Sequence, residues 1–346
     1  MASFASITSA HRASSAEGDP CSPDPDGVVV DVRYCGICAT DTHAWAAGPG
    51  ALPPAVFGHE WAGVVSAVGA DVEGFSVGQR VAAAVGSPCG SCAQCRAGHT
   101  DHCDLVFAEA NGIAPSSGDH GGFATQVKVP TRRVIAVPDE VTDEAAAMLE
   151  PTAVTFHAVR RTAFALGALV VVQGAGPIGL LTAMHARAAG AGRVIVVEPS
   201  ADRRDVARTL GFSDVVEPGE RLRELLAQLT DGLGADVLFE CTGSAGLLAA
   251  SSELVRRGGT LSLLGYTAEP SQVVYGDWQF RELRLVGSLA YSRIDFTGAL
   301  NAIRSGAVLT APLHTGTVGL SELQETLELL DSGTSPHAKV LVDPRR

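Results

Sequence analysis

Four cysteines lie close together in one glycine-containing segment of the sequence. They follow the spacing C-x2-C-x2-C-x7-C in a predicted lobe over residues 86–105: Cys89, Cys92, Cys95 and Cys103. Four thiolates can close a tetrahedron around one Zn²⁺ and leave no open coordination position, which is the chemistry of a structural site. A [4Fe–4S] cluster also uses short C-x2-C spacings, but its typical pattern has a proline after the last cysteine, where this chain has Asp104. The segment therefore predicts a closed structural zinc site, with an iron–sulfur cluster as the alternative.

A second group combines a cysteine, a histidine and carboxylates, which are the donors of an open metal site. Cys38 lies within the segment 35–43, His59 and Glu60 follow Gly58, and Glu150 precedes a proline. One Cys, one His and one carboxylate supply three zinc ligands and leave a fourth position for water or a substrate, as a catalytic zinc requires. Taken singly, Cys38 is more often a small buried hydrophobe and Glu150 a helix-start carboxylate. The combination with the four-cysteine segment favours the metal site.

A glycine-rich turn follows a run of β-branched residues and opens a helical stretch. Its sequence is Gly174-Ala-Gly176-Pro177-Ile178-Gly179, the G-x-G-x-x-G pattern of a dinucleotide-binding turn. Glu198 closes the next predicted strand and is placed to accept hydrogen bonds from the adenosine ribose hydroxyls. A carboxylate there repels a 2′-phosphate and favours NAD over NADP, although the nearby Arg203 and Arg204 could pair with such a phosphate. The alternative is that the glycines only allow tight helix–strand packing.

Two kinds of strand pattern must position these residues. Residues 1–26 read as a weakly structured edge; short strands over 28–33, 62–68 and 78–85 with glycine turns then predict a mostly antiparallel, partly barrel-like β domain. From about residue 166, fully apolar strands alternate with amphipathic helices, which indicates a parallel sheet covered on both faces. The expected strands are Leu169–Gln173, Val194–Val197, Val237–Glu240, Leu261–Leu264 and Leu283–Val286, and the expected helices include Ile178–Ala189, Arg203–Leu210, Leu222–Leu229 and Leu247–Val255. The tail from about residue 296, with expected helices over Ala299–Arg304 and Ser321–Leu330, either extends this sheet or returns to the first domain.

Length and composition set the class of protein. The 346 residues suggest about two domains, and 38 acidic against 25 basic residues give a net charge of −13. This charge argues against a nucleic acid or an anionic membrane as partner. No apolar run is long enough for a membrane helix, and the N-terminus has no signal-peptide pattern, so we expect a cytoplasmic protein whose eight cysteines are thiols or metal ligands.

Together these motifs resemble the zinc-containing medium-chain dehydrogenases/reductases, the alcohol and polyol dehydrogenase superfamily. The resemblance covers residues 28–344 and rests on Cys-Gly-Ile-Cys-x-Thr-Asp-x-His, Gly-His-Glu, the four-cysteine lobe, Glu-Pro and the glycine turn. It implies an α/β protein with a mostly antiparallel, GroES-like catalytic domain (1–150) and a Rossmann-type, doubly wound, parallel NAD-binding domain (151–292). The segment 293–346 would return to the catalytic domain. The active site would lie in the cleft between the domains.

The resemblance also implies roles for single residues. Cys38, His59 and Glu150 would bind the catalytic zinc, the last directly or through water, and Glu60 would be a neighbouring or transient ligand. Thr40 would take the substrate's hydroxyl proton and pass it through the cofactor ribose to His43. Each chain would hold two zinc ions, one catalytic and one structural, and one NAD. The cofactor-binding set would be Gly174, Gly176, Pro177, Ile178, Gly179, Glu198, Arg203, Thr242 and Leu289.

The substrate is less defined than the chemistry. Glu150-Pro151 and Gly287-Ser-Leu-Ala-Tyr291 resemble the 2,3-butanediol and sorbitol dehydrogenase branch, but Ala290 stands where sorbitol dehydrogenases tend to carry an arginine. We expect an NAD-dependent dehydrogenase of a secondary alcohol, vicinal diol or polyol, or of the matching ketone, that forms a homodimer or homotetramer. The alternatives are a tailoring dehydrogenase of an amino-cyclitol or other natural-product hydroxyl, and a non-catalytic NAD- and zinc-binding protein. His120, in a glycine-rich segment, could also approach the cleft.

Overall fold

The protein divides into two compact units. The computed structural model describes residues 1–48, 55–110, 121–333 and 335–346, so His120 lies outside the described residues. One unit contains Met1–Glu150, Ala290–Leu300 and His314–Arg346, and the other contains Pro151–Leu289 and Asn301–Leu313. Within the described residues, no helix combines the length and apolar character that crossing a membrane requires.

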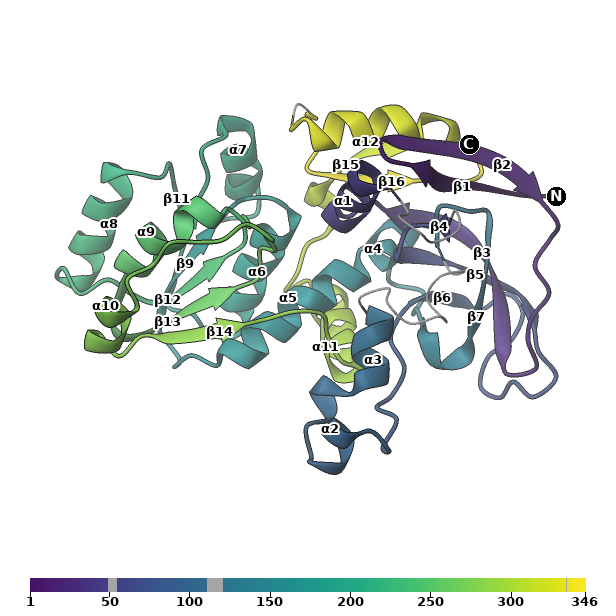
Figure 1. Ribbon diagram of the computed structural model, residues 1–346, viewed down its shortest axis with the longest axis horizontal. Helices are drawn as coiled ribbons and strands as arrows, with labels where there is room; N and C mark the ends of the chain where they lie inside the picture. Colours follow the sequence, from purple (N-terminus) through teal and green to yellow (C-terminus); the bar gives the residue numbers. More distant parts are fainter. Residues whose placement is uncertain (49–54, 111–120, 334) are drawn as a thin grey trace. The chain divides into compact units, whose positions relative to one another are not determined.

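The larger sheet of the first unit is mostly antiparallel (Figure 1). Its strands, in spatial order, are β15 (His314–Val318), β16 (Lys339–Val342), β3 (Gly27–Gly36), β5 (Glu60–Val68), β6 (Arg80–Ala83) and β8 (Val134–Ala136). A further strand, β7 (Gln126–Pro130), pairs with the first half of β3. Only β15 and β16 run parallel to each other. Alternate valines of β3 are buried in the core of this unit. The strand β3 is central: β5 lies along one of its edges, and β7 and β16 lie along the other.

The N-terminal segment is more ordered than the sequence suggested. Instead of a weakly structured edge, it forms the antiparallel hairpin β1 (Ala2–Ser9) and β2 (Arg12–Gly18), and β1 also pairs with β4 (Ala55–Val56). The prediction was wrong because only Ala5 and Ile7 of β1 face the core, and one small alanine with a single isoleucine gives little apolar signal. The helix α12 (Leu323–Asp331) packs beside β2: the Gln324 side-chain carbonyl accepts the Ala13 N–H at 2.6 Å.

Short helices complete the first unit. The helix α1 (Ala39–Ala47) follows β3 directly, and α4 (Asp143–Ala147) packs on β3 and β5. Two further helices, α2 (Ala93–Arg96) and α3 (Asp104–Ala110), belong to the segment that carries four cysteines.

The second unit is built around a six-stranded, fully parallel sheet (Figure 1). Its spatial order is β11 (Asp214–Val216), β10 (Arg193–Val197), β9 (Leu169–Gln173), β12 (Ala235–Glu240), β13 (Val255–Leu263) and β14 (Arg284–Gly287). The chain starts at β9, builds outward to β11, and then returns to β12 on the other side of β9. The point where the order reverses is where open α/β sheets bind their ligands, at the carboxyl ends of the strands.

The expectation of apolar parallel strands covered by helices is confirmed. The helices of this unit are α5 (Leu149–Thr162), α6 (Pro177–Ala188), α7 (Ala201–Thr209), α8 (Glu220–Thr230), α9 (Leu248–Glu253) and α10 (Tyr275–Phe280), whereas most of α11 (Arg293–Arg304) belongs to the first unit. The division between the units falls inside α5 and again inside α11.

The C-terminal segment differs in one part from the expected division. The sequence assigned all of 293–346 to the first domain, whereas Asn301–Leu313 groups with the second unit. The reason is apolar burial: Val308 and Leu313 are fully enclosed, and the Leu309 N–H approaches the Met184 sulfur of α6 at 3.3 Å.

Candidate metal centres and dinucleotide site

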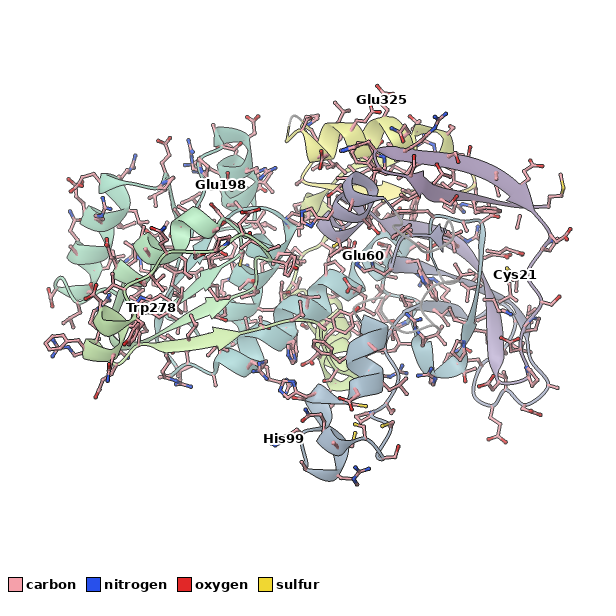
Figure 2. The ribbon with its side chains drawn as sticks, viewed as in Figure 1. Cys21, Glu60, His99, Glu198, Trp278 and Glu325 are labelled. Atoms are coloured by element: carbon pink, nitrogen blue, oxygen red, sulfur yellow. The ribbon has the colours of Figure 1, made fainter. Side chains whose placement is uncertain are left out.

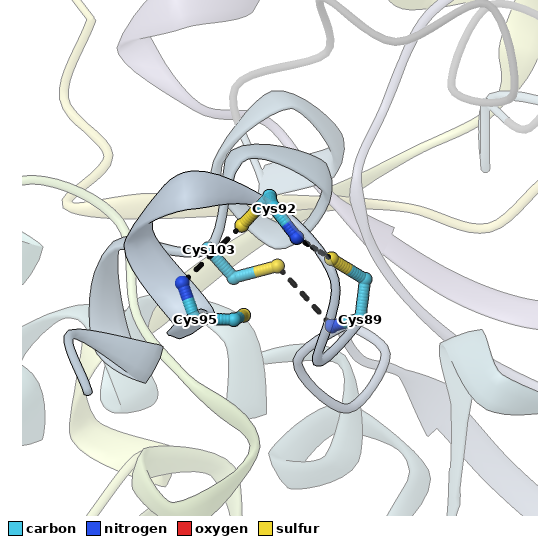
Figure 3. A group of neighbouring side chains, drawn as sticks. All are labelled: Cys89, Cys92, Cys95 and Cys103. Atoms are coloured by element: carbon cyan, nitrogen blue, oxygen red, sulfur yellow. Dashed lines mark hydrogen bonds between the residues drawn. The ribbon is translucent and has the colours of Figure 1, made fainter. Parts of the chain in front are cut away.

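The four cysteines of the lobe converge on one point (Figure 3). Their sulfur atoms all lie within 4.8 Å of one another, and Cys103 is fully buried whereas Cys89 is exposed. Backbone N–H groups point at the sulfurs: Cys92 donates to Cys89 at 3.3 Å, Cys95 to Cys92 at 3.4 Å, and Cys89 to Cys103 at 3.3 Å. Such N–H donors stabilise thiolates, which are the form that binds a metal.

The thiols of the lobe differ in pKa, since burial and hydrogen bonds with the other three cysteines raise the pKa of Cys95 to about 12. Hydrogen bonds from the Ser91 backbone and hydroxyl and from the Cys92 backbone lower the pKa of Cys89 to about 6. The set of close donor atoms contains the four sulfurs and no histidine, although His99 lies in the same lobe (Figure 2). Four thiolates with no open position fit a tetrahedral structural zinc.

A second cluster forms where β3 ends and β5 begins. Donor atoms of Cys38, His59 and Glu60 lie within 4.8 Å of one another. Cys38 is the N-cap of α1, directly after β3, and Glu60 opens the neighbouring β5. The preceding Gly58 has φ +92°, and a Cβ there would lie 2.7 Å from the Cys35 sulfur, so only glycine allows this close turn.

Asp41 links the segment that carries Cys38 to the turn that carries His59. Its carboxylate accepts the Cys38 N–H at 2.8 Å and the Gly58 N–H at 3.3 Å, and it lies 3.8 Å from Nδ1 of His59. Burial lowers the pKa of His59, but Asp41 and Cys38 raise it by more, so the net pKa lies well above the usual value. Sequence reasoning gave Asp41 no role, although an acidic residue three positions into a helix is a capping signal.

Glu150 lies near this cluster but is turned to another partner. Its side chain is buried and hydrogen-bonds the Tyr291 hydroxyl. Burial raises its pKa to about 7; His59 lowers that pKa and Glu60 raises it. The structure therefore groups Glu60, and not Glu150, with Cys38 and His59, while Glu150 stays within electrostatic reach of them.

A buried lysine, which sequence reasoning missed, completes this site. Lys339 forms an ion pair with Glu60, and the two side chains are only 4% and 1% exposed. Its ammonium also donates to the Ile37 carbonyl at 2.8 Å. The one available signal was a charged residue at the start of the apolar strand Lys339–Val342.

Thr40 and His43 lie on one side of α1. Both are exposed and one helical turn apart, while Asp41 and Thr42 between them are buried. Residues three apart on a helix are neighbours on its surface. Two tryptophans near this cluster in the sequence, Trp45 and Trp61, are buried in the core of this unit.

The glycine turn of the second unit joins β9 to α6. A Cβ on Gly179 would lie 1.8 Å from the Gly174 carbonyl oxygen, and Gly174 itself has φ +95°. Gly176 is the N-cap of α6, and a Cβ there would meet nothing within 4 Å. The first and third glycines are thus required by the backbone conformation and close packing of the turn. The second leaves open space at a helix N-terminus, where an anionic pyrophosphate binds favourably. Pro177 and Ile178 are the first helical residues.

Glu198 is fixed beside this turn, just after β10 (Figure 2). Its carboxylate is buried and accepts the N–H groups of Ala175 at 2.8 Å and of Ser200 at 2.9 Å. The Arg204 guanidinium binds the Glu198 and Pro199 carbonyls and pairs with Glu217, whereas Arg203 is exposed.

Two more cofactor candidates follow strands of the same sheet. Thr242 comes after β12, where its N–H donates to Glu240 at 2.7 Å, and Leu289 comes after β14 and is half exposed. They therefore follow the same carboxyl ends of the strands as Gly174 and Glu198.

Comparisons with known proteins agree with this arrangement. The alcohol dehydrogenase GroES-like domain family matches residues 24–139, and the zinc-binding dehydrogenase family matches residues 177–305. A sorbitol dehydrogenase from Halalkalibacterium halodurans is 33% identical over 93% of this chain and 93% of its own length.

Solved structures show the same fold. The 2R,3R-butanediol dehydrogenase from Bacillus subtilis is 28% identical, with a TM-score of 0.87 over 99% of this chain and 100% of that one. A zinc-binding dehydrogenase from Sinorhizobium meliloti 1021, bound to NADP, is 30% identical, with a TM-score of 0.85 over 99% of both chains.

Proposed function

Because the chain belongs to the zinc-binding alcohol dehydrogenase family, we propose that it transfers hydride between a secondary alcohol, vicinal diol or polyol and NAD at a zinc bound by Cys38, His59 and Glu150. The chain is an alcohol or polyol dehydrogenase by this relationship. Its zinc ligands, its preference for NAD and its substrate class are what we propose. The observation that carries it is the cluster of one thiol, one imidazole and one carboxylate (Cys38, His59 and Glu60) where β3 ends and β5 begins, with the buried Glu150 within electrostatic reach of it.

The choice of Glu150 as third ligand rests on the partners of the two carboxylates. Glu60 already has a buried cation partner in Lys339, whereas Glu150 has the neutral hydroxyl of Tyr291. A buried carboxylate with a neutral partner gains most from a metal cation. Three protein ligands leave a fourth position for the substrate oxygen, whereas the four-cysteine lobe would hold a second, closed zinc.

This chain's own residues would bind the metal and move the proton. When bound, zinc supplies Lewis-acid stabilisation of negative charge on the substrate oxygen, and NAD accepts the hydride. Thr40 follows the ligand Cys38 by two residues, and its exposed hydroxyl is placed to accept the alcohol proton. His43, one turn further along α1, would release that proton to water. The alcohol thus loses one hydride and one proton and becomes the ketone.

The cofactor would be held by the glycine turn and Glu198. The pyrophosphate would enter the open space at Gly176, and the carboxylate of Glu198, which is fixed beside the turn, would accept hydrogen bonds from the adenosine ribose. Its charge disfavours a 2′-phosphate, and the Arg204 guanidinium is already bound to the Glu198 and Pro199 carbonyls and to Glu217. NAD is therefore preferred. Because one relative binds NADP, both cofactors must be measured.

The substrate class follows the relatives. Sorbitol and butanediol dehydrogenases act on polyols and vicinal diols by their names, and the absence of an arginine at Ala290 favours a smaller or less polar member of this class. We also propose a homodimer or homotetramer, which sedimentation velocity tests. Exposed apolar side chains of Tyr275, Phe280 and Leu285 give such an assembly a surface to bury.

The test is reduction of NAD and NADP against a panel of alcohols. The panel contains vicinal diols, sugar polyols, simple secondary alcohols and amino-cyclitols, each assayed with both cofactors. The proposal expects NADH formation, fastest with a vicinal diol or small secondary alcohol, and slower NADPH formation. A protein that is fully loaded with zinc and reduces neither cofactor with any panel member contradicts it. Turnover confined to amino-cyclitols would establish the tailoring dehydrogenase instead.

A further inference from the structure

A mostly apolar cavity lies between the last turns of α5 and α6, inside the second unit. Its volume is about 340 Å³, and Phe156, Val159, Phe164 and His185 contribute to its walls. An apolar cavity of about 150 Å³ is already large enough to bind benzene. This cavity therefore has room for a molecule with two fused rings.

His185 brings a hydrogen-bond acceptor to the cavity. Its Nε2 lies 3.2 Å from the Thr152 carbonyl oxygen. Because a carbonyl oxygen only accepts, Nε2 carries the ring hydrogen and Nδ1 is left as the acceptor. Burial lowers the pKa of His185 to about 4, so the ring is neutral at neutral pH and Nδ1 keeps its lone pair.

This acceptor is unpartnered and accessible. The His185 side chain belongs to a residue that is only 3% exposed, and no group in the described part of the chain donates to its Nδ1. Nδ1 is also not one of the side-chain atoms that the described residues enclose completely without a partner. Since His185 lines the cavity, we infer that Nδ1 is reached from there.

The walls and the acceptor together define the chemistry of a ligand. Phe156 already contacts the His185 ring edge to face, with the ring centroids 5.4 Å apart, and Phe164 adds a second aromatic side chain. Aromatic rings pack favourably in such surroundings. A ligand without a donor would cover Nδ1 and leave it unpartnered, which lowers affinity. The best fit is an aromatic ring system that carries one hydroxyl group.

The cavity is separate from the glycine turn. It opens beside the exposed side chains of Arg160 and Ala188. The glycine turn lies at the other end of α6, where Gly176 is the N-cap. At 1.5 Å per residue, His185 lies about 14 Å further along the helix axis.

We propose that this cavity is a second ligand site, which binds one phenol or naphthol with its O–H donated to Nδ1 of His185. The aromatic rings lie against Phe156 and Phe164. An ether or a ketone of the same shape binds more weakly, because neither has a hydrogen to donate.

The test is isothermal titration calorimetry of the full-length, zinc-loaded protein with 2-naphthol and with 2-methoxynaphthalene. The second compound keeps the two rings and the oxygen but has no O–H. We expect one 2-naphthol per chain with a Kd below about 1 mM. The Kd of 2-methoxynaphthalene should be about tenfold higher, the effect of one hydrogen bond.

Two replacements of His185 isolate the hydrogen bond. His185→Phe keeps a ring against Phe156, and the Thr152 carbonyl still accepts the Thr155 hydroxyl at 3.0 Å. This variant should bind 2-naphthol about tenfold more weakly and 2-methoxynaphthalene as the wild type does. His185→Asn places an amide oxygen near the position of Nδ1 and should retain the preference for 2-naphthol.

Two alanine replacements locate the site. Ala188→Phe puts a ring into the mouth of the cavity and should weaken binding of both compounds more than tenfold. Ala250→Phe, at an exposed position of α9 outside the cavity, is the matched control and should change neither Kd. Cys38→Ser should also leave both Kd values unchanged, because Cys38 belongs to the other unit.

Each outcome decides the proposal. It is overturned if wild-type protein binds no 2-naphthol, or binds both compounds with the same Kd. Loss of binding in Cys38→Ser, with normal binding in Ala188→Phe, places the ligand at the metal site and overturns it as well. If His185→Phe does not fold, the wild-type comparison of the two compounds and Ala188→Phe still decide.

Discussion

The glycine turn between β9 and α6 gives a prediction whose size follows from the structure. In Gly179→Ala, the added methyl would lie 1.8 Å from the Gly174 carbonyl oxygen, whereas real Cβ contacts stay beyond 3.0 Å. The turn must therefore move by at least 3.0 − 1.8 = 1.2 Å. Overpacking of this kind costs about 3 kcal/mol, which lowers the Tm of a unit of this size by about 6–12 °C.

Gly176→Ala is the matched control in the same turn. Its methyl meets nothing within 4 Å, and its φ of −71° suits alanine. Alanine is a poorer N-cap than glycine, which lowers the free energy of unfolding, but it also reduces the entropy of the unfolded chain, which raises it. The two effects nearly cancel, so the Tm should change by less than about 2 °C. The methyl would occupy the space of the pyrophosphate, and the Kd for NAD should rise about 10- to 100-fold.

Calorimetry without cofactor and titration with NAD separate the two effects. The prediction is a low Tm for Gly179→Ala and a normal Tm with weak NAD binding for Gly176→Ala. Wild-type affinity for NAD in Gly176→Ala would refute the assignment of this turn as the pyrophosphate site. An unchanged Tm in Gly179→Ala would refute the packing argument.

Three further predictions concern other parts of the chain. Thr40→Ala should lower kcat about a hundredfold with zinc content unchanged, whereas unchanged kcat excludes the proton relay. Cys95→Ser should remove about one zinc per chain and lower the Tm by about 5 °C or more, whereas Cys21→Ser should do neither; equal zinc in both variants excludes the closed lobe site. Burial lowers the pKa of His185 to about 4, so protonation opposes folding. The free energy of unfolding should fall as pH decreases from about 6.5 to 4, by up to about 3 kcal/mol, and His185→Gln should reduce this fall in urea titrations at pH 7 and 4.5.

The features that the sequence predicted correctly are local ones. The parallel strands of the second unit are visible in the sequence as apolar runs. The six residues of the glycine turn predict both the turn itself and the helix that follows it. The close approach of the four cysteines likewise needs only one short segment, Cys89–Cys103.

The contacts that the sequence did not reveal depend mostly on strand pairing. Lys339 meets Ile37 and Glu60 across about three hundred residues of chain, because β16 and β5 both pair with β3. A single sequence contains no sign of that register. The same holds for the contact between Glu150 and Tyr291. The hairpin β1–β2 was missed for a different reason, since strands built from alanine and serine bury too little apolar surface to show a clear alternation.

We propose that Cys38 belongs to an open zinc site that the oxidation of an alcohol requires. The most direct measurement is zinc content together with NADH formation from the best substrate of the panel, in the wild type and in Cys38→Ser. We expect about two zinc ions per chain in the wild type and about one in Cys38→Ser, with loss of NADH formation and little change in Tm. Full NADH formation by a Cys38→Ser protein that holds only its lobe zinc would contradict it.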